Sequence, residues 1–185
     1  MVAADSDEAL MSAYRDGDAG AFGVLYARHR GGLYRFVLRQ CGNRATADEL
    51  FQDVWMNLIA ARDRYLPTAK FSTYLYQVAR NRIVDYFRAR SRYPQMAEDE
   101  QEPVDPPAPP ANQPERQVEA HRRAVRLIAL IEALPFAQRE AFLLHEDGGL
   151  TLEQIARVTG VGRETVKSRL RYALSRLREG MEEWL

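Results

Sequence analysis

The sequence predicts an all-α protein built from two small helical domains joined by a proline-rich, acidic linker. Apolar residues recur at spacings of three and four along most of the chain, and no long stretch alternates with the period of a β-strand. Hydrophobic residues make up 46% of the 185 residues, enough to build helical cores. Seven of the nine prolines lie between Pro94 and Pro114, where each proline removes an amide donor and restricts the residue before it.

The proline-rich stretch divides the chain into three parts. We expect residues 1–92 and residues 116–185 to form the two domains, and residues 93–115 to form an extended, semi-rigid linker. Helices are expected wherever an apolar period is bounded by glycine, proline, asparagine or aspartate. These helices span residues 6–15, 19–41, 46–63, 71–91, 116–133, 136–146, 152–159 and 163–179.

Composition argues against several classes of protein. Cys41 is the one cysteine, so the chain cannot form an internal disulfide or a cysteine-based zinc site, and a buried thiol in a reducing compartment is the simplest interpretation. No apolar run approaches the ~20 residues that a membrane span needs. The acidic segment 1–8 does not resemble a secretory signal. We therefore expect a cytoplasmic protein with no membrane insertion.

The formal net charge of zero conceals strong segregation of charge. Seven basic residues lie between Arg157 and Arg178, against the single acid Glu164, and five arginines lie between Arg80 and Arg92, against Asp85. Between these two basic stretches, residues 94–115 carry six acids and no lysine or arginine. Local charge governs affinity for nucleic acid more than total charge does, so both basic stretches are candidate contact surfaces.

The C-terminal part of the chain carries the pattern of a helix-turn-helix. Thr151 and Gln154 have capping-box spacing, and the glycine-containing segment 159–162 is a tight turn. A second, basic helix follows. Its predicted apolar face consists of Val166, Leu170, Leu174 and Leu177. An ordinary helical hairpin with a solvated basic face would share part of this pattern, but the coincidence of cap, turn and charge favours a helix that enters the major groove of DNA.

Several residues of this second helix point away from its apolar face at ~100° per residue. Glu164, Ser168, Arg171 and Tyr172 lie on the outward side, with Thr165 and Lys167 beside them. With the neighbouring arginines, the predicted set for duplex DNA is Arg163, Glu164, Thr165, Lys167, Ser168, Arg169, Arg171 and Tyr172.

The helix FSTYLYQVARNRIVDYFRAR combines a core face with a polar and aromatic stripe. Its predicted inner residues are Leu75, Ala79, Ile83 and Tyr86. The stripe holds Tyr74, Gln77, Asn81 and Arg88, and Tyr65, Lys70 and Phe71 come just before it or at its start. Interleaved aromatic and basic residues suit single-stranded nucleic acid, because bases stack on rings while phosphates meet cations. Core aromatics beside solvated arginines would produce the same pattern.

The segment ATADELFQDVWMNLIAARDRY has more apolar residues than one helix face requires. It also carries Asp48, Glu49, Gln52 and Asp53, with Trp55 nearby. Surplus apolar surface on a helix often docks a partner helix. A fully buried central helix is the alternative, and periodicity alone favours it.

Together, these segments resemble the extracytoplasmic-function (ECF) group of bacterial sigma factors. ADELFQDVWMNL resembles the polymerase-binding region of that family, and FSTYLYQVARNRIVDYFRAR resembles the region that melts and reads the minus-ten promoter element. ALPFAQREAFLLHEDGGLTLEQIARVTGVGRETVKSRLRYALSRLRE resembles the domain that reads the minus-thirty-five element, with TVKSRL after a short turn as its most specific run.

The resemblance implies a function and a set of partners. It implies binding to a coiled coil in the largest subunit of core RNA polymerase through Asp48, Glu49, Gln52, Asp53 and Trp55. It implies that the helix-turn-helix holds promoter DNA as a duplex. The melted strand would be captured by Tyr65, Lys70, Phe71, Tyr74, Gln77, Asn81 and Arg88. An anti-sigma factor is a further expected partner.

Two other classes of function can be compared with this one. A stand-alone transcriptional regulator would use residues 1–92 for sensing or dimerisation and would bind duplex DNA tightly without polymerase. A nucleic-acid enzyme would need clustered carboxylates or metal ligands, and the sequence does not assemble them: His29, His121 and His145 are scattered, and no phosphate-binding glycine loop is present. We therefore expect no catalytic residues, no metal and no cofactor.

Overall fold

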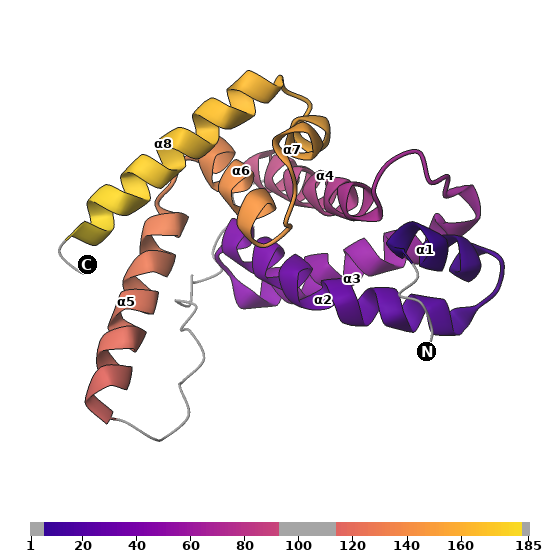
Figure 1. The fold of residues 1–185 in the computed structure, drawn as a ribbon, viewed down its shortest axis with the longest axis horizontal. Helices are drawn as coiled ribbons and strands as arrows, with labels where there is room; N and C mark the ends of the chain where they lie inside the picture. The colour runs from indigo at the N-terminus through magenta and orange to yellow at the C-terminus, as the bar shows by residue number, and fades with distance from the viewer. Residues whose placement is uncertain (1–5, 93–113, 183–185) are drawn as a thin grey trace.

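The computed structural model describes residues 6–92 and 114–182, and all regular secondary structure within these ranges is helical (Figure 1). The elements, in chain order, are α1 (Asp7–Arg15), α2 (Ala19–Cys41), α3 (Arg44–Ala60), the short 3₁₀ helix η1 (Arg62–Arg64), α4 (Phe71–Arg92), α5 (Pro114–Glu132), α6 (Phe136–Glu146), α7 (Leu152–Thr159) and α8 (Arg163–Met181). The all-α class predicted from the sequence is confirmed.

Capping side chains fix where the first helices begin. The side chains of Ser6, Asp18 and Asn43 accept backbone N–H groups at the starts of α1, α2 and α3. Such caps satisfy amide groups that have no partner within the helix. Gly42 ends α2 in the left-handed conformation with φ 68°, which glycine adopts without steric cost. The breaks expected near residues 16–18 and 41–43 are therefore real helix boundaries.

Helices α1 to α4 pack around one apolar core in the N-terminal half. Leu25, Phe36, Leu58 and Leu75 are among its fully buried side chains and come from α2, α3 and α4. On α4 the predicted inner face is largely correct, because Leu75, Ala79 and Ile83 are buried, and Tyr86 is half-buried. This packing fixes the rotation of α4 and therefore decides which of its residues face outward.

Helices α5 to α8 form the C-terminal half. α6, α7 and α8 pack on one another, while α5 extends from the body and meets the C-terminal part of α8 (Figure 1). Gly180 lies so close to Leu130 that an added Cβ would come within 2.4 Å of a leucine methyl carbon. The linker predicted at residues 93–115 lies outside the described residues except for its last two positions, which begin α5 with Pro114 at the first helical position.

One position on the predicted apolar face of α8 was wrong. Val166, Leu170 and Leu177 are buried, whereas Leu174 is 46% exposed and Ala173 takes the core position beside it. The helix rotates ~100° per residue, so a face drawn at steps of four drifts away from the core over several turns. The smaller Ala173 is thus the residue that lets α8 pack closely.

The two halves of the chain are in direct contact. α4 packs along α7, and α2 packs against both α6 and α5 (Figure 1). Predicting two domains joined by a linker did not anticipate this contact. Within the described ranges, no helix has the length and apolar character needed to cross a membrane.

Candidate nucleic-acid and polymerase interfaces

The predicted helix-turn-helix is formed by α7 and α8. The Thr151 hydroxyl accepts the Gln154 N–H, and the Gln154 side chain accepts the Thr151 N–H, so the capping box is complete. Gly160 ends α7 with φ 70°, and extended Gly162 precedes α8. Ile155 and Val166 are buried between the two helices. This arrangement packs one side of α8 against α7 and leaves another side open to solvent.

The open side of α8 carries most of the residues predicted to read duplex DNA. Those exposed are Arg163, Glu164, Thr165, Lys167, Arg171 and Tyr172, whereas Ser168 and Arg169 are half-buried. The Arg171 guanidinium lies over the ring of Tyr172, 5.0 Å from its centroid. Arg163 Nε donates to Glu153 at 2.6 Å and Arg163 Nη1 to Glu164 at 3.2 Å, so its charge is held by neighbours at the start of the helix.

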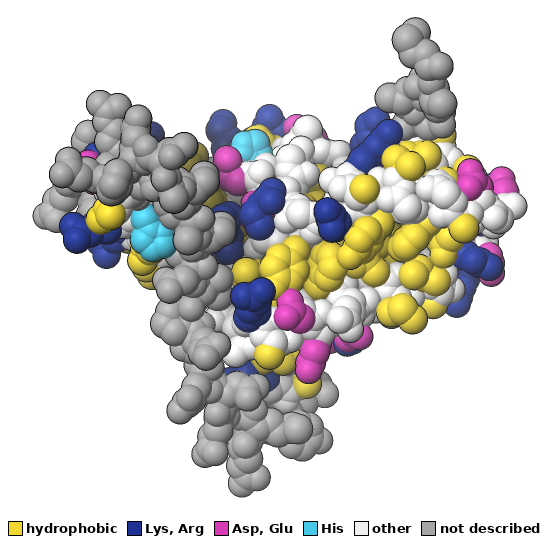
Figure 2. All heavy atoms as spheres, turned by 90° about the horizontal axis from the view of Figure 1, so that it is seen from below, with side chains coloured by type: hydrophobic (Ala, Val, Ile, Leu, Met, Phe, Trp, Pro, Cys, Tyr) yellow, Lys and Arg dark blue, Asp and Glu magenta, His cyan; other side chains and the backbone are white. Residues whose placement is uncertain are grey.

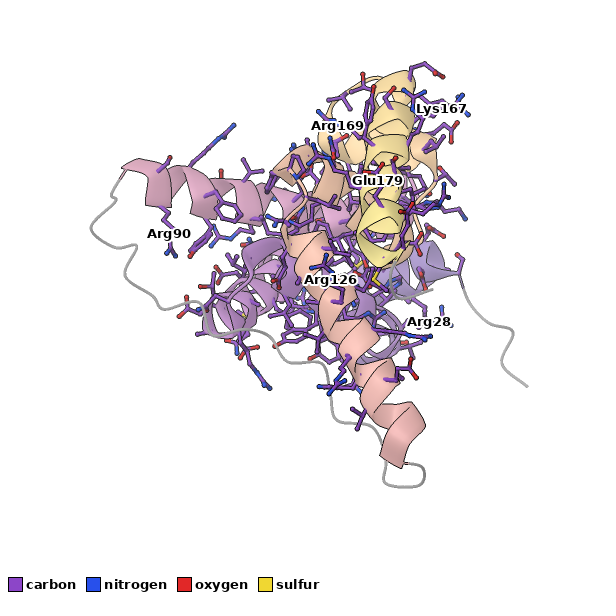
Figure 3. The ribbon with its side chains drawn as sticks, turned by 90° about the vertical axis from the view of Figure 1, so that its left-hand side faces the viewer. Arg28, Arg90, Arg126, Lys167, Arg169 and Glu179 are labelled. Carbon is purple, nitrogen blue, oxygen red and sulfur yellow. The ribbon has the colours of Figure 1, made fainter. Side chains whose placement is uncertain are left out.

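Arg169 differs from the other basic residues of α8. Figure 3 shows it on the opposite side of the helix from Lys167. Its charge acts on the buried carboxyl of Glu140 in α6, where it partly offsets the rise in pKa that burial causes. Arg169 therefore faces the protein, and Lys167 is the basic side chain better placed for a DNA backbone.

On α4 the structure keeps the polar stripe at the surface. Gln77, Asn81 and Arg88 are exposed, and Tyr74 is half-buried. Lys70, just before the helix, is also exposed. Tyr74 stacks obliquely on Tyr65, with ring centroids 5.4 Å apart. The stripe therefore begins at a pair of aromatic rings and continues as amide and guanidinium groups.

A cavity of about 350 Å³ opens at the start of this stripe. Its lining residues are Tyr65, Leu66, Thr68, Ala69, Thr73, Tyr74, Gln77 and, from α7, Arg157. The Tyr65 hydroxyl and the Thr73 hydroxyl are both buried there and find no hydrogen-bond partner among the residues that the structure describes. Burial raises the pKa of Tyr65 to about 12, so its hydroxyl remains a neutral donor near pH 7. The cavity thus combines rings and an amide, with two unpaired hydroxyls buried in its wall.

Two predicted stacking residues are not available at the surface. Phe71 is 0% exposed, with the His29 ring 5.2 Å away, and its N–H donates to Glu8. Placing Phe71 on a base-stacking surface was therefore wrong for this structure, because the first residue of α4 is turned into the core. The ring of Tyr65 is also buried, and it serves as a wall of the cavity instead of an exposed stacking platform.

The residues predicted to bind polymerase lie mostly on the outward side of α3. Asp48, Glu49 and Gln52 are exposed, and Asp53 is half-buried in an ion pair with Arg82. Asp48 accepts a hydrogen bond of 2.7 Å from the Tyr34 hydroxyl. Met56, which the sequence argument overlooked, is 62% exposed. It follows Glu49, Gln52 and Asp53 on one face of the helix at spacings of three and four.

Trp55 is a core residue and not part of the exposed surface, which corrects its predicted contact with polymerase. Its ring is buried against Phe22, Tyr26 and Phe51, with centroids 5.8, 5.0 and 6.3 Å away. These partly exposed aromatics belong to α2 and α3. Figure 2 shows hydrophobic side chains gathered in a band over this side of the molecule. Trp55 therefore supports an apolar surface from beneath.

The described ranges contain no cluster of side chains suited to binding a metal ion, and their cysteine is not activated. No group of three or more histidine, cysteine, aspartate or glutamate side chains there could hold a metal ion. Cys41 is half-buried, and burial raises the pKa of its thiol to about 12, so the reactive thiolate is disfavoured.

Comparisons with known proteins agree with this geometry. The Sigma-70 region 2 family model matches residues 25–93, and the Sigma-70 region 4 model matches residues 124–177. The first range contains α3, the cavity and α4, and the second contains the helix-turn-helix. Together the two models match more than half of the chain.

Relatives match the chain nearly end to end. It is 33% identical to the ECF RNA polymerase sigma factor RpoE of Cereibacter sphaeroides, over 94% of this chain and 93% of that protein. It is 29% identical to the RNA polymerase sigma factor CarQ of Myxococcus xanthus, over 94% and 96%.

Two solved structures share the fold. The sigma factor RpoE of Bartonella quintana, solved with the anti-sigma factor NepR, aligns with a TM-score of 0.70 at 23% identity over 87% of this chain and 96% of that one. CnrH, solved with the cytosolic domain of CnrY, aligns with a TM-score of 0.69 at 22% identity over 97% and 99%. The family models, the relatives and the arrangement of helices agree, and the chain belongs to the ECF group of RNA polymerase sigma factors.

Proposed function

We propose that this protein binds core RNA polymerase, directs it to promoters and helps to open the DNA for transcription initiation. The observation that carries the proposal is the presence, in one ECF family chain, of an exposed recognition helix and a polar aromatic cavity. The first is suited to a duplex and the second to an unstacked base. Binding energy alone accounts for this role, so the protein needs no catalytic residue.

The outward face of α3 is the proposed polymerase-docking surface. Glu49, Gln52 and Met56 present an acid, an amide and a flexible apolar side chain along one line. The aromatic band beside them supplies apolar area. A helix that combines apolar and polar groups in this way suits docking against helices, and the proposed partner is a coiled coil of the largest polymerase subunit.

Helix α8 is the proposed reader of the upstream promoter element. Its first half projects Glu164, Thr165, Lys167 and Arg171 into solvent. Recognition helices usually contact base edges through their N-terminal half, and arginine makes the commonest specific contact, to guanine. Arg176 and Arg178, exposed further along the helix, suit phosphates, which position the protein on DNA without reading its sequence.

The cavity at the start of α4 is the proposed site for a base of the melted strand. Tyr65 and Tyr74 supply rings, Gln77 an amide, and Thr73 a hydroxyl without a partner in the described part of the chain. A flipped base needs stacking and hydrogen bonds on its pairing edge to offset the loss of its duplex neighbours. Asn81 and Arg88 continue the same exposed stripe and suit the adjacent nucleotides.

An anti-sigma factor is a proposed further partner, and the cytoplasm is the proposed compartment. Both of the solved structures described above are complexes of two proteins, and one of them is named as a sigma factor with its anti-sigma factor. The proposed work on polymerase and DNA takes place in the bacterial cytoplasm.

Run-off transcription with core polymerase, in the presence and absence of this protein, tests the proposal. The expected result is promoter-specific transcript only when both components are present. The free protein should bind duplex DNA weakly and with strong dependence on salt. Nanomolar, sequence-specific binding by the free protein at physiological salt, without any stimulation of polymerase, would instead favour a stand-alone regulator.

A further inference from the structure

Polar contacts to buried carboxylates join the two halves of the chain. The Asp147 carboxylate, at the end of α6, is 6% exposed and accepts hydrogen bonds from Arg35 Nε and Arg39 Nη1 of α2, each at 3.0 Å. The Tyr76 hydroxyl of α4 donates to the Asp147 carbonyl oxygen at 3.1 Å. Three side chains of the N-terminal half thus donate hydrogen bonds to one residue of the C-terminal half.

A second carboxylate joins both DNA-reading helices. Glu140 of α6 is 2% exposed and accepts from Arg80 Nε of α4 at 2.8 Å, and the charge of Arg169 on α8 also acts on it. Buried carboxylates are costly unless cations and hydrogen bonds compensate them. The arrangement is therefore specific to the packed halves, and a chance contact between surfaces would not supply it.

The two halves also fit closely in shape where they meet. Gly32 lies inside α2, where alanine is normally the better helix former, yet a Cβ there would come within 2.5 Å of the Asp147 carbonyl oxygen. The clash is with backbone, which cannot rotate away. Phe87 of α4 and Phe136 of α6 complete the contact edge to face, with centroids 5.8 Å apart.

In this packed arrangement α4 and α8 lie too close together to contact both promoter elements at once. If the proposed function holds, α4 and α8 read elements ~25 base pairs apart, which is ~85 Å along B-DNA. Here α7 packs on both helices. Packed helices lie ~8–10 Å apart, so at the contact the two readers are separated by only ~20 Å. Residues 93–113 join the two halves, and a segment of that length can extend up to ~70 Å.

We propose that the contact centred on Gly32, Glu140 and Asp147 is a closed, autoinhibited state of the free protein, which must open before both promoter elements can be read. The inhibitory role rests on the proposed function, whereas the closed packing of the two halves does not. Arg157 of α7 lines the cavity at Tyr74 and Gln77, so opening also removes one wall of the proposed base site.

The test compares Gly32→Ala with Gly23→Ala in the full-length protein. Both substitutions add one methyl group to α2, but nothing lies within 4 Å of a Cβ at Gly23. Circular dichroism verifies that each variant is folded. Small-angle X-ray scattering then measures the radius of gyration, which should rise by roughly a third for Gly32→Ala as two domains of ~12 Å radius separate. Wild type and Gly23→Ala should stay compact.

Titration of core polymerase in run-off transcription is the second readout. If most free molecules are closed and cannot direct transcription, Gly32→Ala should reach half-maximal transcription at a protein concentration several-fold lower than wild type does. An opened variant with no gain would overturn the inhibitory role. A folded Gly32→Ala as compact as wild type, or a wild type whose halves are already separated, would overturn the closed state.

Asp147→Ala is a second test of the closed state, which applies even if Gly32→Ala fails to fold. It removes the acceptor of Arg35 and Arg39 without adding bulk to α2, and it should increase the radius of gyration in the same direction. Scattering involves no polymerase, so a protein that fails to support transcription but opens as described would refute the proposed function and leave the closed state standing.

Discussion

At the scale of single residues, the cavity wall is the most informative feature. Thr73 has a fully buried hydroxyl that finds no acceptor in the described part of the chain, yet it lines an open cavity of about 350 Å³. Leaving a buried polar group unpaired usually costs ~1–3 kcal/mol. Because the oxygen has almost no accessible surface, we expect a base to meet this hydroxyl only when the cavity wall shifts on binding.

Replacing Thr73 by valine should separate stability from function. The change keeps the shape of the side chain and removes the unpaired hydroxyl, so the free energy of unfolding should stay level or rise by ~1 kcal/mol in chemical denaturation. Permanganate footprinting of the promoter bubble should show several-fold less open complex. A bubble of normal intensity would remove this hydroxyl from the base site, and Ser91→Ala on the exposed end of α4 serves as the control.

Two arginines of α8 should have different effects on sequence preference. Arg171 lies one turn after Lys167 on the exposed side, whereas Arg176 lies further along. Arg171→Ala should cost ~1–3 kcal/mol of discrimination at one upstream base pair, because a bidentate contact to guanine would be lost. Arg176→Ala should weaken all promoters alike and lower the salt slope by ~1. Transcription from a library of upstream-element variants distinguishes the two, and equal scaling of every promoter by Arg171→Ala would contradict base reading.

At the scale of elements, helix ends decide where the functional groups point. Lys70, just before α4, has no acceptor in its side chain, and Glu8 of α1 accepts the Phe71 N–H at 2.7 Å. This hydrogen bond lowers the pKa of Glu8 below its ordinary 4.5. The carboxylate also complements the positive end of the α4 dipole. α1 therefore fixes the start of the helix that carries the base site.

Glu8→Ala should reduce the free energy of unfolding by ~1 kcal/mol at pH 7, as the loss of an N-cap does. Because the folded pKa of Glu8 is lowered, its contribution is present above pH 4.5 and disappears as the pH falls through the lower folded value. The difference between wild type and Glu8→Ala should therefore shrink below pH 4.5, as followed by urea denaturation at several pH values. A constant difference would show that the charge of Glu8 is not responsible.

The outward face of α3 should bind polymerase without supporting the fold. Gln52→Ala combined with Met56→Ala removes exposed groups and leaves the Asp53–Arg82 ion pair in place. Pull-down with core polymerase should show at least several-fold weaker assembly, while the thermal midpoint stays close to that of wild type. Trp55→Ala is the contrasting variant, since emptying a buried aromatic site costs ~3–5 kcal/mol. Undiminished assembly by the folded double variant would move the docking surface elsewhere.

The sequence predicted these elements well because their signals are local. The glycines at 42 and 160, the capping box at Thr151 and the proline at 135 each mark a helix end through their own backbone chemistry. Burial was harder to predict, because it depends on contacts between elements. Phe71, Tyr65 and Trp55 were placed on functional surfaces but lie in the core, and Met56 and Arg157 entered the candidate sites only with the structure.

At the scale of the whole molecule, the packing of the two halves depends on residues that look ordinary in sequence. Asp147 reads as part of a turn and Glu140 as one acid on an amphipathic helix. No local pattern pairs them with Arg35, Arg39 or Arg80, which lie far away along the chain. Contacts of this kind form only when helices from both halves meet, so periodicity cannot reveal them.

The pair Arg80–Glu140 offers the most stringent test of how the two halves hold together. Arg80→Met leaves a buried carboxylate with Arg169 as its main remaining cation, so it should favour the open molecule strongly. Glu140→Gln leaves Arg80, whose side chain is 24% exposed and can be hydrated, so its effect should be smaller. Combining both changes removes the unpaired charge, and the double variant should be more compact than Arg80→Met alone.

The readout is the population of the compact form from small-angle scattering across the four proteins of a double-mutant cycle. Residues in one ion-pair network typically couple by ~0.5–3 kcal/mol, so the two substitutions should be clearly non-additive. Strict additivity would mean that the 2.8 Å contact does not stabilise closure. In that case the closed state would depend on the other contacts between the halves, chiefly Asp147, which two arginines and a tyrosine of the N-terminal half bind, and the ring pair Phe87–Phe136.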